Sequence, residues 1–291
     1  MQTVYHLDEI PPAILFNALV YWGEFTSLAL AERALLTKLQ LGAQKTQKQL
    51  IIINFNEQDT NKQKFRSLPD SDLLLKAFFP SIIWFDFQPN YHYNSPELSI
   101  EINHFIQTFS PQSLQIAAPL QQKLNLSTKK AQNKKAWMII VEQNRQIWET
   151  LLTGRPAEAN KLLGYYFFLN SYVISGNQLG TKIGFPTINM EINRQFFYPK
   201  LGCYVTVTLL EDNKKYFGLT CLFEKNPHEF YFETYLEKFS KKVYQDYART
   251  YFLTFYRENK TIKSPDELKK LLTKDLKFLQ NKPALERNWL I

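Results

Sequence analysis

The sequence predicts two domains: a Rossmann-like α/β domain in residues 1–155, and a small antiparallel β-barrel with a C-terminal helix in residues 160–291. The chain of 291 residues is longer than a single hydrophobic core usually serves. In the first half, short apolar runs alternate with amphipathic segments, which is typical of parallel strands with crossover helices. Seven of the nine glycines lie between Gly154 and Gly218, which indicates a change of architecture there.

The elements expected in the first half follow from this alternation. Apolar runs predict strands at 18–23, 50–54, 82–87, 114–117 and 137–141. Apolar residues spaced by three and four predict helices at 27–41, 70–78, 96–109 and 145–152. Between two glycine stops, Thr153–Gly164 has a proline at a helix start, which predicts a short helical connector. We place the domain boundary near this connector.

After Gly164 the pattern becomes that of an antiparallel β-domain. Alternating apolar and polar residues predict strands at 166–175, 202–210, 215–222, 229–236 and 243–256. Turn sequences E-D-N-K and E-K-N-P separate some of these runs. The segment S-P-D-E at Ser264–Glu267 then provides an N-cap, a proline at the first helical position and acids in the first turn. These features predict a closing helix.

Composition excludes several classes of protein. No run of 18 apolar residues appears, and the N-terminus lacks the layout of a signal peptide, so we expect a cytoplasmic protein that does not enter the membrane. Without a secretory signal, Cys203 and Cys221 are expected to be buried thiols and not a disulfide. Four scattered histidines and the absence of a C-x-x-C pair give no indication of zinc.

The net charge of +8 and the pI near 9.2 raise the question of a nucleic-acid partner. The lysines are spread through helical and loop segments, with only local clusters. A solvated basic face, or attraction of polyanionic nucleotides, explains this charge without a nucleic-acid-binding module. We therefore expect small-molecule partners and no nucleic acid.

The segment Gly176–Asn189, G-N-Q-L-G-T-K-I-G-F-P-T-I-N, has the composition of a phosphate-binding turn. It carries three glycines at four-residue spacing: Gly176, Gly180 and Gly184. Glycine lets backbone N–H groups approach an oligophosphate because no Cβ intervenes. Pro186 stiffens the exit, and Thr187 and Asn189 offer oxygen ligands suited to Mg²⁺. From spacing alone, a glycine-rich hairpin between two strands is the favoured interpretation.

This segment resembles the G-x-x-x-G-x-x-x-G-F-P-T-x-N signature of riboflavin kinases, including those of the bifunctional bacterial riboflavin kinase/FMN adenylyltransferases, or FAD synthetases. The resemblance implies that Thr187 and Asn189 lie at the metal, with Mg²⁺, ATP and riboflavin or FMN as ligands. It assigns the nucleotide to a set of motif residues: Gly176, Gly180, Lys182, Gly184, Phe185, Pro186 and Thr187.

For the catalytic base, the resemblance points to a glutamate on a late strand. In F-E-T-Y-L-E-K-F that position is Glu233, which shares a strand face with Tyr231 and Tyr235. From the residues alone, a solvent-facing cross-strand acid is the alternative. The chain departs from the family where an N-I-G-x-R-P-T loop is expected and C-L-F-E-K-N-P stands instead.

The order of α/β domain, connector and barrel also resembles the bifunctional enzymes, but the N-terminal motifs are degenerate. Ala29 and Glu32 stand where two phosphate-binding histidines are expected, and Trp148 stands where an arginine is expected. We therefore expect riboflavin phosphorylation with FMN adenylylation lost. The alternatives are a catalytically impaired flavin- or nucleotide-binding regulator and a basic RNA-binding regulator, for which the RNA-binding motifs are missing.

Overall fold

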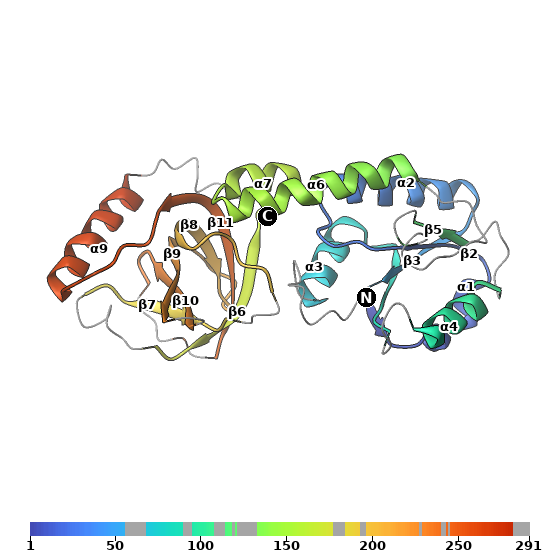
Figure 1. Ribbon diagram of the computed structural model, residues 1–291, viewed down its shortest axis with the longest axis horizontal. Coiled ribbons are helices and arrows are strands. Elements are labelled where there is room, and N and C mark those ends of the chain that lie inside the picture. Colours follow the sequence, from blue (N-terminus) through green and yellow to red (C-terminus); the bar gives the residue numbers. More distant parts are fainter. Residues whose placement is uncertain are drawn as a thin grey trace. The chain divides into compact units, whose positions relative to one another are not determined.

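The chain divides into two compact units, Met1–Arg145 and Gln146–Ile291 (Figure 1). The structure is a computed structural model. It describes residues 1–55, 68–89, 95–107, 114–117, 120, 133–176, 184–192, 196–226, 229–239, 243 and 245–281. The domain limits taken from the sequence, 1–155 and 160–291, remain a prediction.

The first unit is built on a five-stranded parallel sheet in the order β1-β4-β3-β2-β5. Its strands are β1 (Gln2–Val4), β2 (Ala18–Gly23), β3 (Gln49–Phe55), β4 (Ile83–Phe87) and β5 (Leu114–Ile116). Strands β2 and β3 are almost continuously buried, as parallel strands covered on both faces are. The predicted Rossmann-like arrangement is confirmed.

Helices connect and cover these strands. They are the short η1 (Leu7–Glu9) and α1 (Pro12–Leu15), then α2 (Leu30–Lys45), α3 (Leu68–Phe78), α4 (Pro96–Gln107) and α6 (Lys134–Leu152). Within the described ranges, none of the helices combines the length and apolar character needed to cross a bilayer.

The strand predicted at 137–141 is wrong, because these residues lie inside α6. Trp137, Ile140, Ile147 and Leu151 are buried at helical spacing, whereas Met138 and its neighbour Ile139 are exposed. The local run W-M-I-I-V has the apolar content of a strand. The helical period becomes visible only over the longer segment.

A hydrogen bond links α6 to strand β2. Trp137 Nε1 donates this bond to the buried Tyr21 hydroxyl at 2.6 Å, and burial raises the pKa of Tyr21 to about 12.

The second unit is a closed barrel with the strand order β10-β7-β6-β11-β8-β9. Its strands are β6 (Phe168–Ile174), β7 (Thr187–Met190), β8 (Gly202–Leu209), β9 (Lys215–Asn226), β10 (Glu229–Leu236) and β11 (Tyr247–Arg257). All six pairings are antiparallel. The predicted barrel is confirmed, and β7 is an additional strand that the sequence patterns did not indicate.

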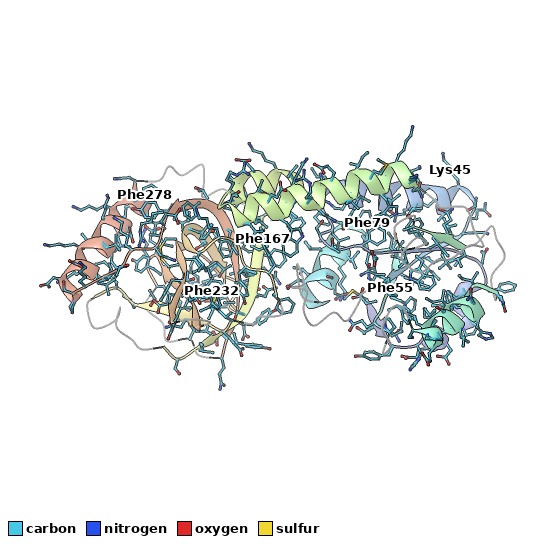
Figure 2. The ribbon with its side chains drawn as sticks, in the orientation of Figure 1. Lys45, Phe55, Phe79, Phe167, Phe232 and Phe278 are labelled. Carbon is cyan, nitrogen blue, oxygen red and sulfur yellow. A yellow bond between two sulfur atoms is a disulfide. The ribbon has the colours of Figure 1, made fainter. Side chains whose placement is uncertain are left out.

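Threonines and aromatic rings share the barrel interior. Thr206, Thr220 and Thr234 are fully buried on three neighbouring strands, and their hydroxyls form a chain of hydrogen bonds of 2.8 Å. Buried hydroxyls need such partners, so the threonines satisfy one another. Phe232 and Phe167, both labelled in Figure 2, belong to the apolar part of this core.

Two helices flank the barrel strands in the sequence. The connector α7 (Pro156–Leu163) ends at Gly164, whose φ of 68° is the left-handed conformation that glycine favours. The closing helix α9 (Pro265–Gln280) begins after Ser264, whose hydroxyl accepts a hydrogen bond from the Glu267 amide at 3.2 Å. Both helices confirm the predicted start and stop signals.

Cys203 and Cys221 form a disulfide, so the expectation of two thiols is wrong. The two residues are direct partners in the β8–β9 pairing, with Cα atoms 4.1 Å apart. The expectation rested on cellular compartment alone, whereas the antiparallel register brings the two side chains to one face.

Candidate active site

The short strand β7 carries the end of the glycine-rich motif and presents two polar residues on one face. Ile188 and Met190 are buried, while Thr187 and Asn189 on the opposite face are half-buried. Their hydroxyl and amide oxygens therefore lie on the same side of the strand. Oxygens of this kind are ligands for hard divalent cations.

Strand β10 runs antiparallel to its neighbour β7 (Figure 1). The register of this pairing places Glu233 directly opposite Asn189. Thr187 lies opposite Tyr235, two residues along the same face. Residues opposed in this way have Cβ atoms about 4.5–5.5 Å apart. The Glu233 carboxylate, the Asn189 amide and the Thr187 hydroxyl are thus brought to one surface, from parts of the sequence more than forty residues apart.

Burial along β10 fixes which way Glu233 faces. Phe232 and Thr234 are buried, and Thr234 belongs to the threonine chain of the barrel interior. Glu233 alternates with them and is half-buried on the outer face, together with Tyr231 and Tyr235. The face predicted for Glu233 is therefore correct. Burial, and then the charge of Glu237, raise the pKa of Tyr235.

Gly176 lies directly against the Asn189 side chain. A Cβ placed on Gly176 would stand 2.1 Å from Asn189 Nδ2 and 2.3 Å from Cγ, which is far inside van der Waals contact. Only glycine leaves room for the amide at this place. The first and last residues of the motif therefore meet, and the backbone of Gly176 restricts where the Asn189 side chain can point.

The structure describes three further residues of the glycine-rich motif, which lead into β7. Gly184 has a φ of 89°, which a residue with a Cβ adopts only under strain. Phe185 is buried, and the exposed Pro186 leads from it into β7. Gly180 and Lys182 lie outside the described residues. No group of three or more His, Cys, Asp or Glu side chains that could hold a metal occurs in the described part of the chain.

In the first unit, the loop after β2 wraps around a carboxylate of the chain itself. Glu32 is fully buried, and its oxygens accept hydrogen bonds of 2.6–3.4 Å from the backbone amides of Thr26, Ser27 and Leu28. The Asn144 side chain donates another at 2.9 Å. Strand order reverses between β2 and β5, which is where open α/β sheets bind nucleotides. The loop amides at this edge already have an anionic partner.

The other positions at which the first half departs from the family motifs are also apolar, and nearby polar side chains form hydrogen bonds within the chain. Ala29 is buried and is the N-cap residue of α2 without a side-chain hydrogen bond. Trp148 packs edge-on against Phe197, with ring centroids 4.1 Å apart. At the same sheet edge, Asn54 accepts a bond from the Phe25 amide and donates one to the buried Asp86 carboxylate at 2.8 Å. These polar groups satisfy one another.

Comparison with known proteins finds a family match in the barrel unit. The model of the riboflavin kinase family, Flavokinase, matches residues 163–282. The bifunctional riboflavin kinase/FMN adenylyltransferase of Listeria monocytogenes is 29% identical over 133 residues, covering 44% of this chain and 42% of the relative. That of Mycoplasma pneumoniae is 32% identical over 135 residues, covering 46% of this chain and 49% of the relative. The chain thus covers less than half the length of these relatives.

A solved structure with the same fold covers both units. It is the crystal structure of a protein from Streptococcus pneumoniae titled a macrolide-efflux protein. It aligns with 97% of this chain and 99% of its own, with a TM-score of 0.70 and 17% sequence identity. At this identity the likeness shows the fold alone.

Two features, one in each unit, were not expected from the sequence. The contact of Gly176 with Asn189 needs the return of β7 beside the start of the loop, which spacing does not reveal. From the sequence, Glu32 is identified only as a residue that stands in place of an expected phosphate-binding histidine. Its position in the first turn of a helix, after the polar pair Thr26 and Ser27, is the signal that could have identified an internal cap.

Proposed function

We propose that the barrel unit is a riboflavin kinase that transfers the γ-phosphoryl group of ATP to the primary hydroxyl of riboflavin, giving FMN and ADP. The observation that carries this proposal is the pairing of Glu233 with Asn189 on the outer face of a riboflavin kinase family domain, with Thr187 beside them. A base and a set of oxygen ligands on one surface are what phosphoryl transfer requires.

In the proposed reaction Glu233 is the general base. Its carboxylate accepts the proton of the riboflavin hydroxyl while that oxygen forms its bond to the γ-phosphorus. The bond between the γ-phosphorus and the oxygen of ADP breaks as the new one forms. Half-burial keeps Glu233 accessible to the hydroxyl, and its register opposite Asn189 holds it at the phosphate end of the site.

The glycine-rich segment is proposed to hold the nucleotide and Mg²⁺. Thr187 and Asn189 have the donor chemistry for Mg²⁺, and the close approach of Gly176 leaves the Asn189 amide little freedom. A bound Mg²⁺ would neutralise phosphate charge. The nucleotide-binding residues in this proposal are Gly176, Gly180, Lys182, Gly184, Phe185, Pro186 and Thr187.

The first unit is proposed to have no FMN adenylyltransferase activity. Its loop amides are engaged by the Glu32 carboxylate, so an ATP phosphate would have to displace a buried, multiply hydrogen-bonded anion. Ala29 offers no side-chain donor. Trp148, which lies just beyond this unit and stands in place of an expected arginine, packs with Phe197. In this proposal the unit keeps the fold of a nucleotidyltransferase without its chemistry.

The test is FMN formation by the purified chain supplied with riboflavin, ATP and Mg²⁺. The proposal predicts FMN with one ADP released for each FMN formed. Binding of riboflavin and ATP without any turnover would contradict it and would favour the alternative of a flavin- or nucleotide-binding regulator.

A further inference from the structure

The disulfide lies in the same cross-strand row as the candidate active-site pair. Cys221 is opposite Glu233 on one side and opposite Cys203 on the other. Glu233 is opposite Asn189, and Cys203 is opposite Arg257. We call these five residues, each from a different strand, the disulfide row: Asn189, Glu233, Cys221, Cys203 and Arg257.

The two ends of the disulfide row are held differently. At one end, Arg257 forms an ion pair with Asp275 of α9, with 2.5 Å between Nη2 and Oδ2, and the Asp275 side chain is only 4% exposed. At the other end, Asn189 packs against the backbone of Gly176. The disulfide is a covalent link between β8 and β9, and β9 pairs directly with β10, the strand that carries Glu233. Cys203 is buried, whereas Cys221 is half-buried.

We propose that the Cys203–Cys221 disulfide is a redox-sensitive bond that positions Glu233, so that its cleavage by a dithiol reductant slows phosphoryl transfer. This inference rests on the proposed kinase function of the same site. Glu233 is the catalytic residue, and the cysteines are positioning residues that act through it.

The redox step is a thiol–disulfide exchange. A thiolate of the reductant attacks Sγ of the more accessible Cys221, the S–S bond breaks, and the sulfur of Cys203 leaves as a thiolate that takes up a proton. The second thiol of the reductant then attacks the mixed disulfide and releases Cys221 as a thiol. The protein gains two electrons and two protons, and the reductant becomes a disulfide.

Cleavage must alter the strand spacing or the side-chain positions at this row. The Cα atoms of the two cysteines are 4.1 Å apart, and two sulfur atoms that are no longer bonded cannot remain at bonding distance. Strand β9 lies between β8 and β10, so a movement of Cys221 acts on the residue opposite it, Glu233. A general base must lie within about 3 Å of its proton, and a misplacement of about 1 Å can cost about a hundredfold in rate.

The experiment compares the fully oxidised and fully reduced full-length chain. Titration of thiols defines each state, because the chain has only two cysteines. FMN formation with Mg²⁺-ATP gives kcat and the KM for ATP, and hydrogen exchange reports on residues 219–223 and 231–235. We expect reduction to lower kcat at least tenfold, to leave the KM for ATP within twofold, and to speed exchange in both segments. Equal kcat in the two states, with FMN formed, would overturn the inference and leave the kinase function standing.

Failure of the kinase function has a different signature. If neither state forms FMN, the proposed function fails, and hydrogen exchange alone decides the coupling. Faster exchange at 231–235 on reduction would sustain the link between the disulfide and Glu233. Unchanged exchange there would overturn it.

Variants separate positioning from general stability. A double variant, Cys203→Ala with Cys221→Ala, should have the kcat of the reduced chain and no response to dithiols. Val207→Ala, a truncation of a buried residue in β8 away from the disulfide row, is the control. It should keep the oxidised kcat and the redox response. The inference is overturned if the double variant retains the oxidised kcat, or if Val207→Ala lowers kcat as much as reduction does.

Discussion

At the scale of single residues, Glu32 shows how a charged side chain can be buried at low cost. The backbone amides of Thr26, Ser27 and Leu28 and the Asn144 side chain all donate to its carboxylate. The positive end of the α2 dipole adds to these bonds. The same set of donors would suit a phosphate, so the loop is stable because its anion is part of the chain.

We predict that Glu32→Ala lowers the free energy of unfolding by about 3 kcal/mol, since each buried amide left without an acceptor costs about 1–3 kcal/mol. Urea denaturation measures the change. Glu97→Ala is the matched control, because Glu97 is an exposed acid in the first turn of α4. Its loss should cost less than about 1 kcal/mol. Equal effects of the two substitutions would contradict this role of Glu32.

Gly176 has a comparably specific role in the second unit. We predict that Gly176→Ala displaces the Asn189 side chain and raises the KM for ATP at least about tenfold, which corresponds to about 1.4 kcal/mol of binding. Steady-state kinetics of FMN formation measures it. Gly42→Ala in α2 is the control, because a Cβ there meets no atom within 4 Å. It should leave the KM unchanged and stabilise the helix by up to about 1 kcal/mol. A KM for ATP of Gly176→Ala equal to that of the wild type would contradict the proposed role of the glycine-rich segment in nucleotide binding.

At the scale of elements, α9 is fixed to the barrel by both apolar packing and charge. Val205, Leu219, Leu253 and Leu279 form one buried cluster. Phe278 of α9, labelled in Figure 2, stacks on Tyr256. The ion pair of Arg257 with Asp275 lies beside this contact and is nearly buried.

We predict that Asp275→Asn lowers the free energy of unfolding by about 3 kcal/mol, because it leaves the largely desolvated Arg257 charge, whose side chain is 15% exposed, without its buried partner. Thermal and urea denaturation measure this loss. The exposed pair Lys200–Glu258 provides the comparison. Glu258→Gln should cost less than about 1 kcal/mol. If both substitutions cost the same, the Arg257–Asp275 pair does not anchor α9.

Strong local patterns made many of these elements predictable. The strands at 18–23 and 229–236 have the predicted limits, because each is a dense apolar or alternating run between turn residues. The helix α6 was partly missed, because W-M-I-I-V at its start has strand-like content and only the wider period identifies a helix. The short strand β1 was missed because three residues carry too little pattern; its pairing with β4 is a tertiary contact.

The candidate site was predictable in its residue types and not in its geometry. Alternation alone put Glu233 on the face of Tyr231 and Tyr235, and burial bears this out. The register could not be predicted in this way. The residue opposite Glu233 depends on how β10 pairs with β7 and β9, which is a tertiary contact. For the same reason the sequence did not reveal that Cys203 and Cys221 are partners.

At the scale of the whole molecule, the chain combines an α/β unit and a barrel unit, and the proposed chemistry lies in the barrel unit alone. We predict that conversion of FMN and ATP to FAD by the purified chain stays at background. The reason is that the buried Glu32 carboxylate already accepts hydrogen bonds from the backbone amides at the sheet edge where a nucleotide would bind. FAD is measured by chromatography after incubation with FMN, ATP and Mg²⁺. Turnover at about 1 per second or more, a rate typical of enzymes, would contradict this account.

The most direct test of the central claim is the kcat of Glu233→Gln in the riboflavin kinase assay. Glutamine keeps the shape of the side chain and cannot accept the hydroxyl proton, so we expect kcat to fall about 10²–10⁴-fold while ATP binding is retained. Glu224→Gln, which neutralises an exposed acid on the neighbouring β9, should leave kcat unchanged. A Glu233→Gln variant that forms FMN at the wild-type rate would contradict the assignment of the active site to the outer face of β7 and β10.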